Sequence, residues 1–299
     1  MDKMIFEEYL NCNLCARECG VDRYASLGAC NSPAEIKLAR AALHFWEEPP
    51  ISGSRGSGAI FFSGCSLSCS FCQNYEISRG KLGCEVSVGR LSEIMLELEA
   101  QGAHNINLVT TTHYVPSIRA AIITARERGL SVPIVYNTGS FDSPKTLELL
   151  RGLIDIYLAD YKFYTQKSSR EFARAPSYPE SAMAAIDEMY SQVGLPQFDG
   201  EIMRRGIIIR LLELPGHSAE AKLSLSRLYK RYGNSVYFSL MNQFTPTNDA
   251  KPPLNRPVSR EEYRELVSYA ERLGVKNAFV QEFGTADSSF IPNFDMTGI

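Results

Sequence analysis

The sequence has no apolar run that approaches the roughly 20 residues of a membrane-spanning helix. The run from Ile207 to Leu212 comes nearest, and Arg210 interrupts it. The start of the chain carries acidic side chains where a signal peptide needs an apolar core. We therefore expect a cytoplasmic protein with no membrane segment and no targeting segment.

The sequence also lacks a large excess of either acidic or basic residues. The formal net charge is −3, which argues against an overall electrostatic attraction to nucleic acid or to anionic lipid. Hydrophobic residues make up 44% and aromatic residues 10% of the chain, as in globular proteins rather than disordered or membrane ones. A chain of 299 residues is long enough for one large domain and a small extension.

After a Gly/Ser-rich joint at residues 51–58, short apolar segments alternate with helical ones. We expect strands at 59–62, 106–109, 133–136, 154–158, 207–212 and 236–240, with 278–280 as one more candidate. We expect helices at 92–102, 116–128, 144–151, 179–193, 218–232 and 259–273. The expected N-caps are Ser92, Ser143, Ser218 and Ser259, the last forming a capping box with Glu262.

Six β–α units in sequence predict a parallel sheet covered by helices. The fold class is therefore α/β, and six units suit a partial (β/α)6 barrel of the TIM type or a doubly wound sheet. Residues 1–50 are weakly patterned and rich in cysteine. We predict a small N-terminal metal-binding extension over 1–50 and a barrel domain over 51–299.

Three cysteines, Cys65, Cys69 and Cys72, directly follow the first predicted strand in a C-x3-C-x2-C arrangement. We call residues 65–72 the cysteine loop. Soft thiolates suit iron–sulfur clusters or zinc, and three of them leave one iron of a four-iron cluster without a protein ligand. The alternatives are structural zinc with a distant fourth ligand such as Cys84, or three cysteines without a metal.

Four further cysteines, Cys12, Cys15, Cys19 and Cys30, lie within 19 residues. We call them the N-terminal cysteine set. Four thiolates form a closed ligand set, which suits structural zinc or an auxiliary iron–sulfur cluster, and sequence spacing does not choose between the two. Redox-active or unligated thiols are the alternatives. Cys84 we interpret as a small apolar residue.

The ends of the other predicted strands carry polar residues, and in a parallel barrel these ends share one mouth. We expect a ligand site there, formed by Thr111, Thr112, His113, Asn137, Asp160, Lys162 and Gln243. Arg210 lies inside a predicted strand, where a charge is costly unless it is paired. It therefore either contacts a ligand or forms an ion pair with Asp160, and the two roles are compatible.

The segment GSGAIFFSGCSLSCSFCQNYEIS, residues 56–78, resembles the cluster loop of radical S-adenosylmethionine (SAM) enzymes, which carry an aromatic residue before the last cysteine, here Phe71. Within that superfamily the chain is most similar to proteins related to pyruvate formate-lyase activating enzymes. The similarity includes CNLCARECGVDR, HFWEEPPISG, VTTTHYVP, DIYLADYKFY, IIIRLLELPG, FSLMNQFTP and the tail FIPNFDMTG.

This resemblance implies an oxidoreductase with a partial barrel. It implies that the open iron of a [4Fe-4S] cluster binds the amino and carboxylate groups of SAM. The reduced cluster then cleaves SAM to methionine and a 5′-deoxyadenosyl radical, which removes a hydrogen atom from the substrate. The family counterpart of Arg210 contacts SAM. A Gly-Gly-Glu segment of the activating enzymes is replaced here by Thr110–His113, and simpler activating enzymes lack the N-terminal cysteine set.

The resemblance implies a glycyl-radical enzyme as the partner, with flavodoxin or ferredoxin as the electron donor. The alternatives are a small molecule or another peptide as substrate, since fold and cluster do not determine the substrate. A non-catalytic protein with zinc at both cysteine sites is a third hypothesis. We expect no nucleic-acid partner and no membrane partner.

Overall fold

In the computed structural model, residues 5–247, 250–283 and 292–299 are described. Their central feature is one curved sheet with strand order β10-β9-β8-β6-β5-β4-β2-β1-β3, to which β7 adds by pairing with β8. The strands are β1 (Ile36–His44), β2 (Ser57–Phe62), β3 (Cys84–Val86), β4 (Ile106–Val109), β5 (Ile134–Thr138), β6 (Ile156–Asp160), β7 (Gln197–Asp199), β8 (Ile202–Leu212), β9 (Tyr237–Met241) and β10 (Ala278–Val280).

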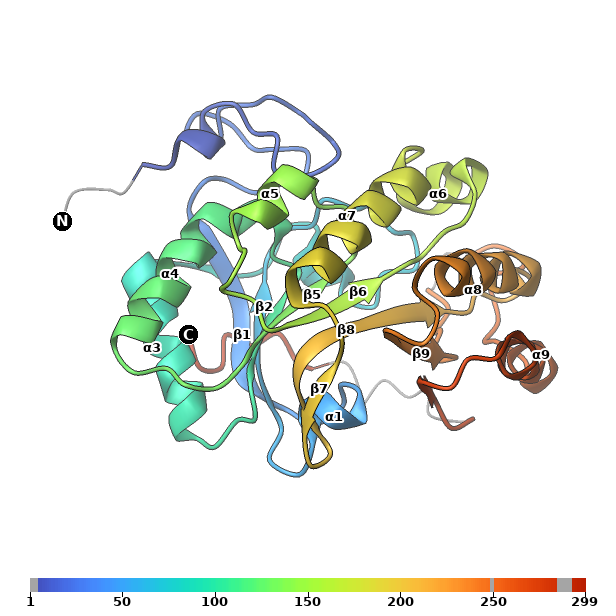
Figure 1. The fold of residues 1–299 in the computed structure, drawn as a ribbon. Coiled ribbons are helices and arrows are strands. Elements are labelled where there is room, and N and C mark those ends of the chain that lie inside the picture. The colour runs from blue at the N-terminus through green and yellow to red at the C-terminus, as the bar shows by residue number, and fades with distance from the viewer. Residues whose placement is uncertain (1–4, 248–249, 284–291) are drawn as a thin grey trace.

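The helices that follow the strands surround the sheet, as Figure 1 shows. They are α1 (Pro49–Ser52), α2 (Tyr75–Ser78), α3 (Val88–Ala100), α4 (Val115–Glu127), α5 (Pro144–Glu148), α6 (Gln166–Ala173), α7 (Tyr178–Val193), α8 (Ser218–Tyr232) and α9 (Arg260–Leu273), with single 3-10 turns η1 (Glu7–Tyr9) and η2 (Thr112–Tyr114). Every residue of β2, β4 and β5 is buried, as expected for parallel strands covered on both faces.

The predicted partial barrel is confirmed. Strands β2, β4, β5, β6, β8, β9 and β10 run parallel, and within the described residues the edge strands β3 and β10 do not pair with each other. The sheet is therefore curved but open. Because the strands are parallel, the segments that leave their carboxyl ends gather on one side of the molecule.

Strand β1 was not predicted from the sequence. It lies within residues 1–50, yet it pairs antiparallel with β2, from Leu38 beside Phe62 to His44 beside Ser57. Because β1 runs against its neighbour, the chain that leaves it at His44 emerges at the amino end of β2. Residues 45–48 therefore reach the barrel from the side opposite the cysteine loop.

Two predicted N-caps, Ser92 and Ser218, are wrong. Helix α3 begins at Val88, and Ser87 caps it by accepting a hydrogen bond from the Arg90 N–H; Ser92 lies a turn inside the helix and is buried. Helix α8 begins at Ser218 itself, so the N-cap position is His217. The other two caps are confirmed, since Ser143 accepts from Thr146 and Ser259 forms the capping box with Glu262.

The end of the described chain lies along β1. The N–H of Met296 donates to the Ala39 carbonyl, and the Ala41 N–H donates to the Thr297 carbonyl. The ring of Phe294 packs edge-on against Phe61, with 5.6 Å between ring centres. The first two residues of the FIPNFDMTG stretch lie outside the described residues.

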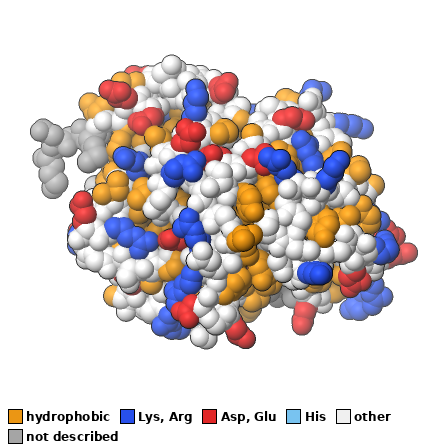
Figure 2. Space-filling view, in the orientation of Figure 1, with side chains coloured by type: hydrophobic (Ala, Val, Ile, Leu, Met, Phe, Trp, Pro, Cys, Tyr) orange, Lys and Arg blue, Asp and Glu red, His pale blue; other side chains and the backbone are white. Residues whose placement is uncertain are grey.

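The molecular surface in view carries interspersed charges of both signs, as Figure 2 shows. No helix among the described residues combines the length and the apolar character that crossing a membrane requires.

Candidate functional site

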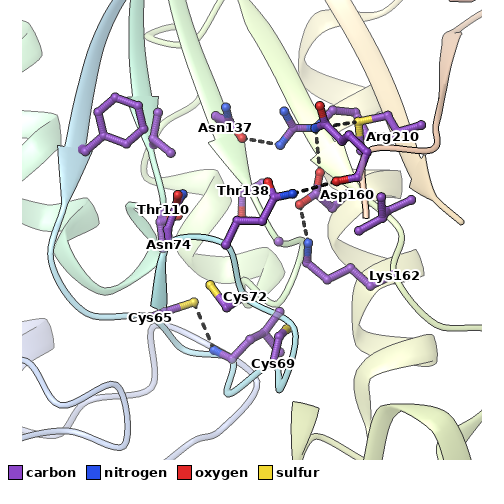
Figure 3. Close-up of a pocket in the computed structure, with 18 of the residues that line it drawn as sticks. Cys65, Cys69, Cys72, Asn74, Thr110, Asn137, Thr138, Asp160, Lys162 and Arg210 are labelled. Carbon is purple, nitrogen blue, oxygen red and sulfur yellow. Dashed lines mark hydrogen bonds and ion pairs between the residues drawn. The ribbon is translucent and has the colours of Figure 1, made fainter. Parts of the chain in front are cut away.

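A cavity of about 240 Å³ lies inside the open barrel, many times the space that one water molecule needs. It is lined by the three cysteines of the cysteine loop and by residues from the carboxyl ends of β4, β5, β6, β8 and β9. Figure 3 shows the cysteines on one loop, facing the polar side chains of these strand ends. The carboxyl ends of the parallel strands, which were predicted to lie together, therefore line one cavity.

The cysteine loop is held by backbone contacts on both sides. Gly64, just before it, has φ of 91°, a left-handed conformation that favours glycine. The N–H of Leu67 points at the Cys65 sulfur at 3.4 Å, and the Ser70 N–H donates to the Phe172 carbonyl at 2.7 Å. All three cysteines of the loop line the cavity.

The loop thiols are difficult to ionise on their own. Burial raises the pKa of Cys65 well above its usual value, and charge on the other two cysteines adds to the effect. Burial also raises the pKa of Cys69 to about 12, against the opposing charge of Lys162. Since metals bind thiolates, a metal centre must supply the positive charge that lets these thiols ionise. The donor set fits an iron–sulfur cluster with one iron left open.

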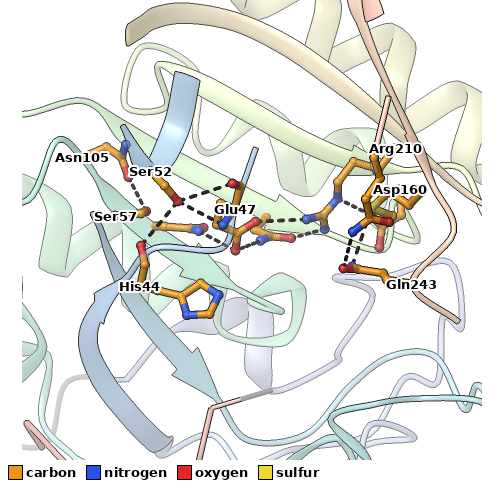
Figure 4. A network of polar contacts seen from close by, with 12 residues as sticks. His44, Glu47, Ser52, Ser57, Asn105, Asp160, Arg210 and Gln243 are labelled. Atoms are coloured by element: carbon orange, nitrogen blue, oxygen red, sulfur yellow. Dashed lines mark hydrogen bonds and ion pairs between the residues drawn. The ribbon is translucent and has the colours of Figure 1, made fainter. Parts of the chain in front are cut away.

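Arg210 of β8 belongs to the polar network in Figure 4, in which it lies between Glu47 and Asp160. Its Nε donates to Asp160 Oδ1 at 2.6 Å, one terminal nitrogen to Glu47 Oε2 at 3.3 Å and the other to Asn137 Oδ1 at 2.5 Å. The Arg210 side chain is only 13% exposed. The proposed ion pair with Asp160 is therefore present, and Arg210 also lines the cavity.

Asp160 links Arg210 to Lys162, whose Nζ lies 2.6 Å from Asp160 Oδ2. Burial alone would raise the pKa of Asp160, but the charges of Arg210 and Lys162 outweigh it and hold that pKa below its usual value. The carboxylate stays ionised, and Lys162 stays close enough to Cys69 to favour its thiolate. The strand-end charges and the cysteine loop are thus electrostatically connected.

Glu47 is a site residue that sequence reasoning missed. It comes from the segment after β1, its side chain is 10% exposed, and its Oε1 accepts from Asn107 at 3.0 Å and Asn137 at 3.1 Å. Burial raises the pKa of Glu47, while Arg210 opposes the effect. The only sequence signal was its position in HFWEEPPISG, a stretch that carried the resemblance but had no assigned role.

Thr111, Thr112 and His113 do not line the cavity; Thr110 does. Thr110 has φ of 64°, and the chain then turns into η2. Thr111, Thr112 and His113 are buried and point away from the cavity surface. His113 Nε2 lies 2.9 Å from the Ser63 carbonyl. Burial and the charge of Arg23 lower the pKa of His113 to about 3. His113 is therefore a neutral, buried residue outside the cavity lining.

The remaining predicted contacts do line the cavity: Phe71, Asn137, Asp160, Lys162 and Gln243. The ring of Phe71 packs against Phe163 and Phe244, with centres 6.1 and 6.0 Å apart. The backbone carbonyl of Gln243 accepts from the side chain of Gln73 at 2.7 Å, which connects the residue directly after the cysteine loop to the segment after β9.

The N-terminal cysteine set lies outside this cavity. Cys12, Cys15 and Cys30 are buried, Cys19 is half-buried, and Cys84 is exposed on β3. Among residues 5–247, 250–283 and 292–299, no three His, Cys, Asp or Glu side chains are grouped for a single metal ion. That result covers both cysteine sets, and metal binding at either stays a prediction.

No model of a protein family matches the sequence. The chain is 24% identical over 271 residues to the uncharacterized protein MJ0674 of Methanocaldococcus jannaschii, covering 88% of this chain and 75% of the relative. Low identity of this kind establishes no function.

Solved structures share the fold at low sequence identity. Methylornithine synthase (PylB) has a TM-score of 0.52 at 16% identity, over 79% of this chain and 68% of PylB. Streptococcus suis SuiB bound to its precursor peptide SuiA has 0.51 at 13%, over 73% and 46%. HydG, a maturase of the [FeFe]-hydrogenase, has 0.50 at 14%, over 72% and 48%. The chain thus spans about half the length of SuiB and HydG, and the likeness is one of fold.

The packing before the cysteine loop predicts a sharp difference between two glycine variants. A Cβ on Gly64 would overlap Ser32 Oγ and lie 3.0 Å from the Cys30 carbonyl, whereas one on Gly102 would meet nothing within 4 Å. Their φ angles are 91° and 94°, so both substitutions carry a similar backbone cost of about 1–2 kcal/mol. We expect Gly64→Ala to lose clearly more unfolding free energy than Gly102→Ala in urea titrations. Equal losses would contradict the close contact.

Proposed function

We propose that this protein is a radical SAM enzyme. The observation that carries the proposal is the arrangement of one cavity: three thiols from a single loop face a buried, partly satisfied guanidinium at the carboxyl ends of parallel strands. Cys65, Cys69 and Cys72 hold three irons of a [4Fe-4S] cluster and leave one iron without a protein ligand. The chemistry that such a cluster supplies is one-electron cleavage of SAM, which gives methionine and a 5′-deoxyadenosyl radical.

Arg210 has the donors that a SAM carboxylate needs. A guanidinium carries five N–H donors, and three of those of Arg210 serve Asp160, Glu47 and Asn137. Among the described residues, the other two N–H groups, one on each terminal nitrogen, have no hydrogen-bond partner. Lys162 uses one of its three donors on Asp160. Both cations therefore keep free donors beside the cysteine loop without leaving their ion pairs.

Part of the cavity wall is apolar. Phe61, Leu212 and Met241 line the cavity as apolar surfaces, and Phe71 packs into an aromatic group behind the loop. Exclusion of water protects a reactive radical from side reactions. One of the structures of SuiB, which shares the fold, contains bound SAM, in line with SAM as the bound cosubstrate here.

The finer proposal is that the substrate is a polypeptide, namely the glycine-bearing segment of a glycyl-radical enzyme. Trp46 lines the cavity yet is 59% exposed, and exposed aromatic residues are typical of sites that contact a protein partner. SuiB has been solved with its precursor peptide, which supports polypeptide access in this fold. A flavodoxin or ferredoxin would supply the electron, in the reducing cytoplasm that suits free thiols.

The first prediction concerns the cysteine loop. Protein reconstituted anaerobically with iron and sulfide, then reduced and given SAM, should form 5′-deoxyadenosine, measured by chromatography. Replacing Cys65, Cys69 and Cys72 by alanine should abolish product, because three irons lose their ligands. Cys84→Ala, which removes an exposed thiol, is the matched control and should leave product unchanged. Absence of product from the wild type, with zinc in place of iron at the loop, would refute the radical chemistry.

The second prediction concerns Arg210. Arg210→Lys keeps the charge but offers three donors from one atom instead of a planar fork, so it cannot serve Asp160, Glu47, Asn137 and a carboxylate together. We expect the dissociation constant for SAM to rise about tenfold or more, a loss of about 1.4 kcal/mol, measured by equilibrium dialysis with iron-loaded protein. The control is Arg204→Lys on the same strand, where the arginine forms an exposed pair with Asp199. If both variants bind SAM like the wild type, Arg210 has no role in SAM binding.

The third prediction separates the substrate classes. Co-incubation of the loaded, reduced protein and SAM with glycyl-radical enzymes of the same organism should give a glycyl signal in electron paramagnetic resonance (EPR) spectra. Omission of SAM, or use of the triple alanine variant, should remove the signal. Deoxyadenosine formation without a glycyl signal from any of these partners would reject the activase role and leave a small molecule or another peptide as the substrate.

A further inference from the structure

The cavity has a second end, away from the cysteine loop, whose ligand chemistry the proposed function does not specify. We call it the aromatic end and define it by His44, Trp46 and Phe61, which all line the cavity. We propose that the aromatic end is the substrate site, and that it binds an uncharged polypeptide segment through an apolar side chain and a peptide group. That this ligand is the substrate rests on the proposed function, whereas the binding preference does not.

The two ends of the cavity come from different parts of the chain. The cysteine loop follows the carboxyl end of β2. Strand β1 runs against β2, with His44 beside Ser57, so residues 44–47 enter the barrel from the amino end of β2. Figure 4 shows Glu47 between His44 on one side and Arg210 on the other. The Arg210 guanidinium is therefore separated from the aromatic end by Glu47.

Aromatic rings form the wall at this end. The rings of His44 and Phe61 meet edge to face, with their centres 6.1 Å apart, and Phe61 makes a similar contact with Phe294 at 5.6 Å. Edge-to-face pairs are a favoured arrangement of aromatic side chains, so these contacts hold the rings in place. Trp46 differs, because it lines the cavity while 59% of its surface is exposed. Its indole is thus accessible to a ligand.

In the described part of the chain, no charge at the aromatic end is free for a ligand. The two carboxylate oxygens of Glu47 accept hydrogen bonds from two asparagine side chains and from Arg210. Arg40, on the same strand as His44, forms an ion pair with Asp295 at 2.8 Å. An ionised ligand group would lose its hydration here without gaining an ion pair, which is unfavourable. The aromatic end therefore selects uncharged groups.

His44 supplies the polar recognition that remains. Burial and the charge of Arg40 lower the pKa of His44, so its ring is uncharged near neutral pH. A neutral imidazole has one N–H donor and one acceptor nitrogen, and among the described residues the hydrogen bonds of His44 involve only its backbone. A peptide group is also uncharged and also offers one donor and one acceptor. The two groups are complementary.

These features together favour a polypeptide over an ionised small molecule. Ligand sites are typically lined by apolar and aromatic side chains, with a few polar groups that fix the orientation of the ligand. The rings of Trp46 and Phe61 suit an apolar side chain, and His44 can pair with the peptide group beside it. The next residue of the bound polypeptide would then face Arg210 and the proposed SAM site.

The fluorescence of Trp46 provides a direct test, because it is the single tryptophan of the chain. The probes are two blocked dipeptides, N-acetyl-Gly-Phe-amide and N-acetyl-Gly-Asp-amide, titrated into iron-loaded, unreduced protein in the presence of saturating SAM. We expect the phenylalanine peptide to change the Trp46 emission with a dissociation constant about tenfold or more below that of the aspartate peptide, since only the latter brings an unpaired charge. Equal binding of the two peptides, or no change with either, would overturn the proposal.

His44→Ala tests the polar part of the site. We expect it to raise the dissociation constant of the phenylalanine peptide about threefold to tenfold, as for one lost hydrogen bond, while the dissociation constant for SAM stays the same. His44→Gln, which retains a donor and an acceptor, should recover part of the loss. The control is Phe45→Ala, because Phe45 is 50% exposed and does not line the cavity. If His44→Ala binds the peptide as Phe45→Ala does, or weakens SAM binding equally, His44 has no role in peptide recognition.

The binding test needs no radical chemistry, so it separates the two proposals. Protein that binds the phenylalanine peptide selectively but forms no deoxyadenosine on reduction would reject the radical function and leave the peptide site standing. Protein that forms deoxyadenosine but does not distinguish the two peptides would reject the peptide site and leave the radical function standing.

Discussion

The cavity depends on how one buried positive charge is neutralised. Arg210 lies inside a strand among apolar residues, and removing one partner of a buried ion pair typically costs about 3–5 kcal/mol. Its guanidinium therefore requires Asp160 from the neighbouring strand, Asn137 from β5 and Glu47 from the segment after β1. These contacts join three strands and the opposite end of the barrel at one point. Asp160 then orients Lys162 toward the cysteine loop.

Much of this arrangement was predictable because it follows from local patterns. Short apolar strands alternating with capped helices indicate a parallel sheet, and parallel strands bring Asn137, Asp160 and Lys162 to one end. The sequence suggested that Arg210 forms an ion pair or contacts a ligand. The ion pair with Asp160 is present, and because the side chain also lines the cavity, the two roles remain compatible.

The features that were missed depend on long-range geometry. Glu47 reaches Arg210 across 163 residues of sequence, and it does so only because β1 runs antiparallel to β2, a pairing that its weak pattern did not indicate. Thr111, Thr112 and His113 were expected to contribute to the ligand site. Thr110 takes a left-handed conformation that is rare for threonine. The chain changes direction there, and the three residues that follow are buried away from the cavity.

The placement of β1 has a consequence for where the structural unit of the barrel begins. The same fifty residues supply the cysteine-bearing segment, a strand of the sheet and the acidic partner of Arg210. A deletion of that segment would leave an edge of the sheet exposed and a positive charge in the interior without one of its counter-ions. Strand β1 and Glu47 are therefore structural parts of the barrel, although they lie in the same fifty residues as the cysteine-bearing segment.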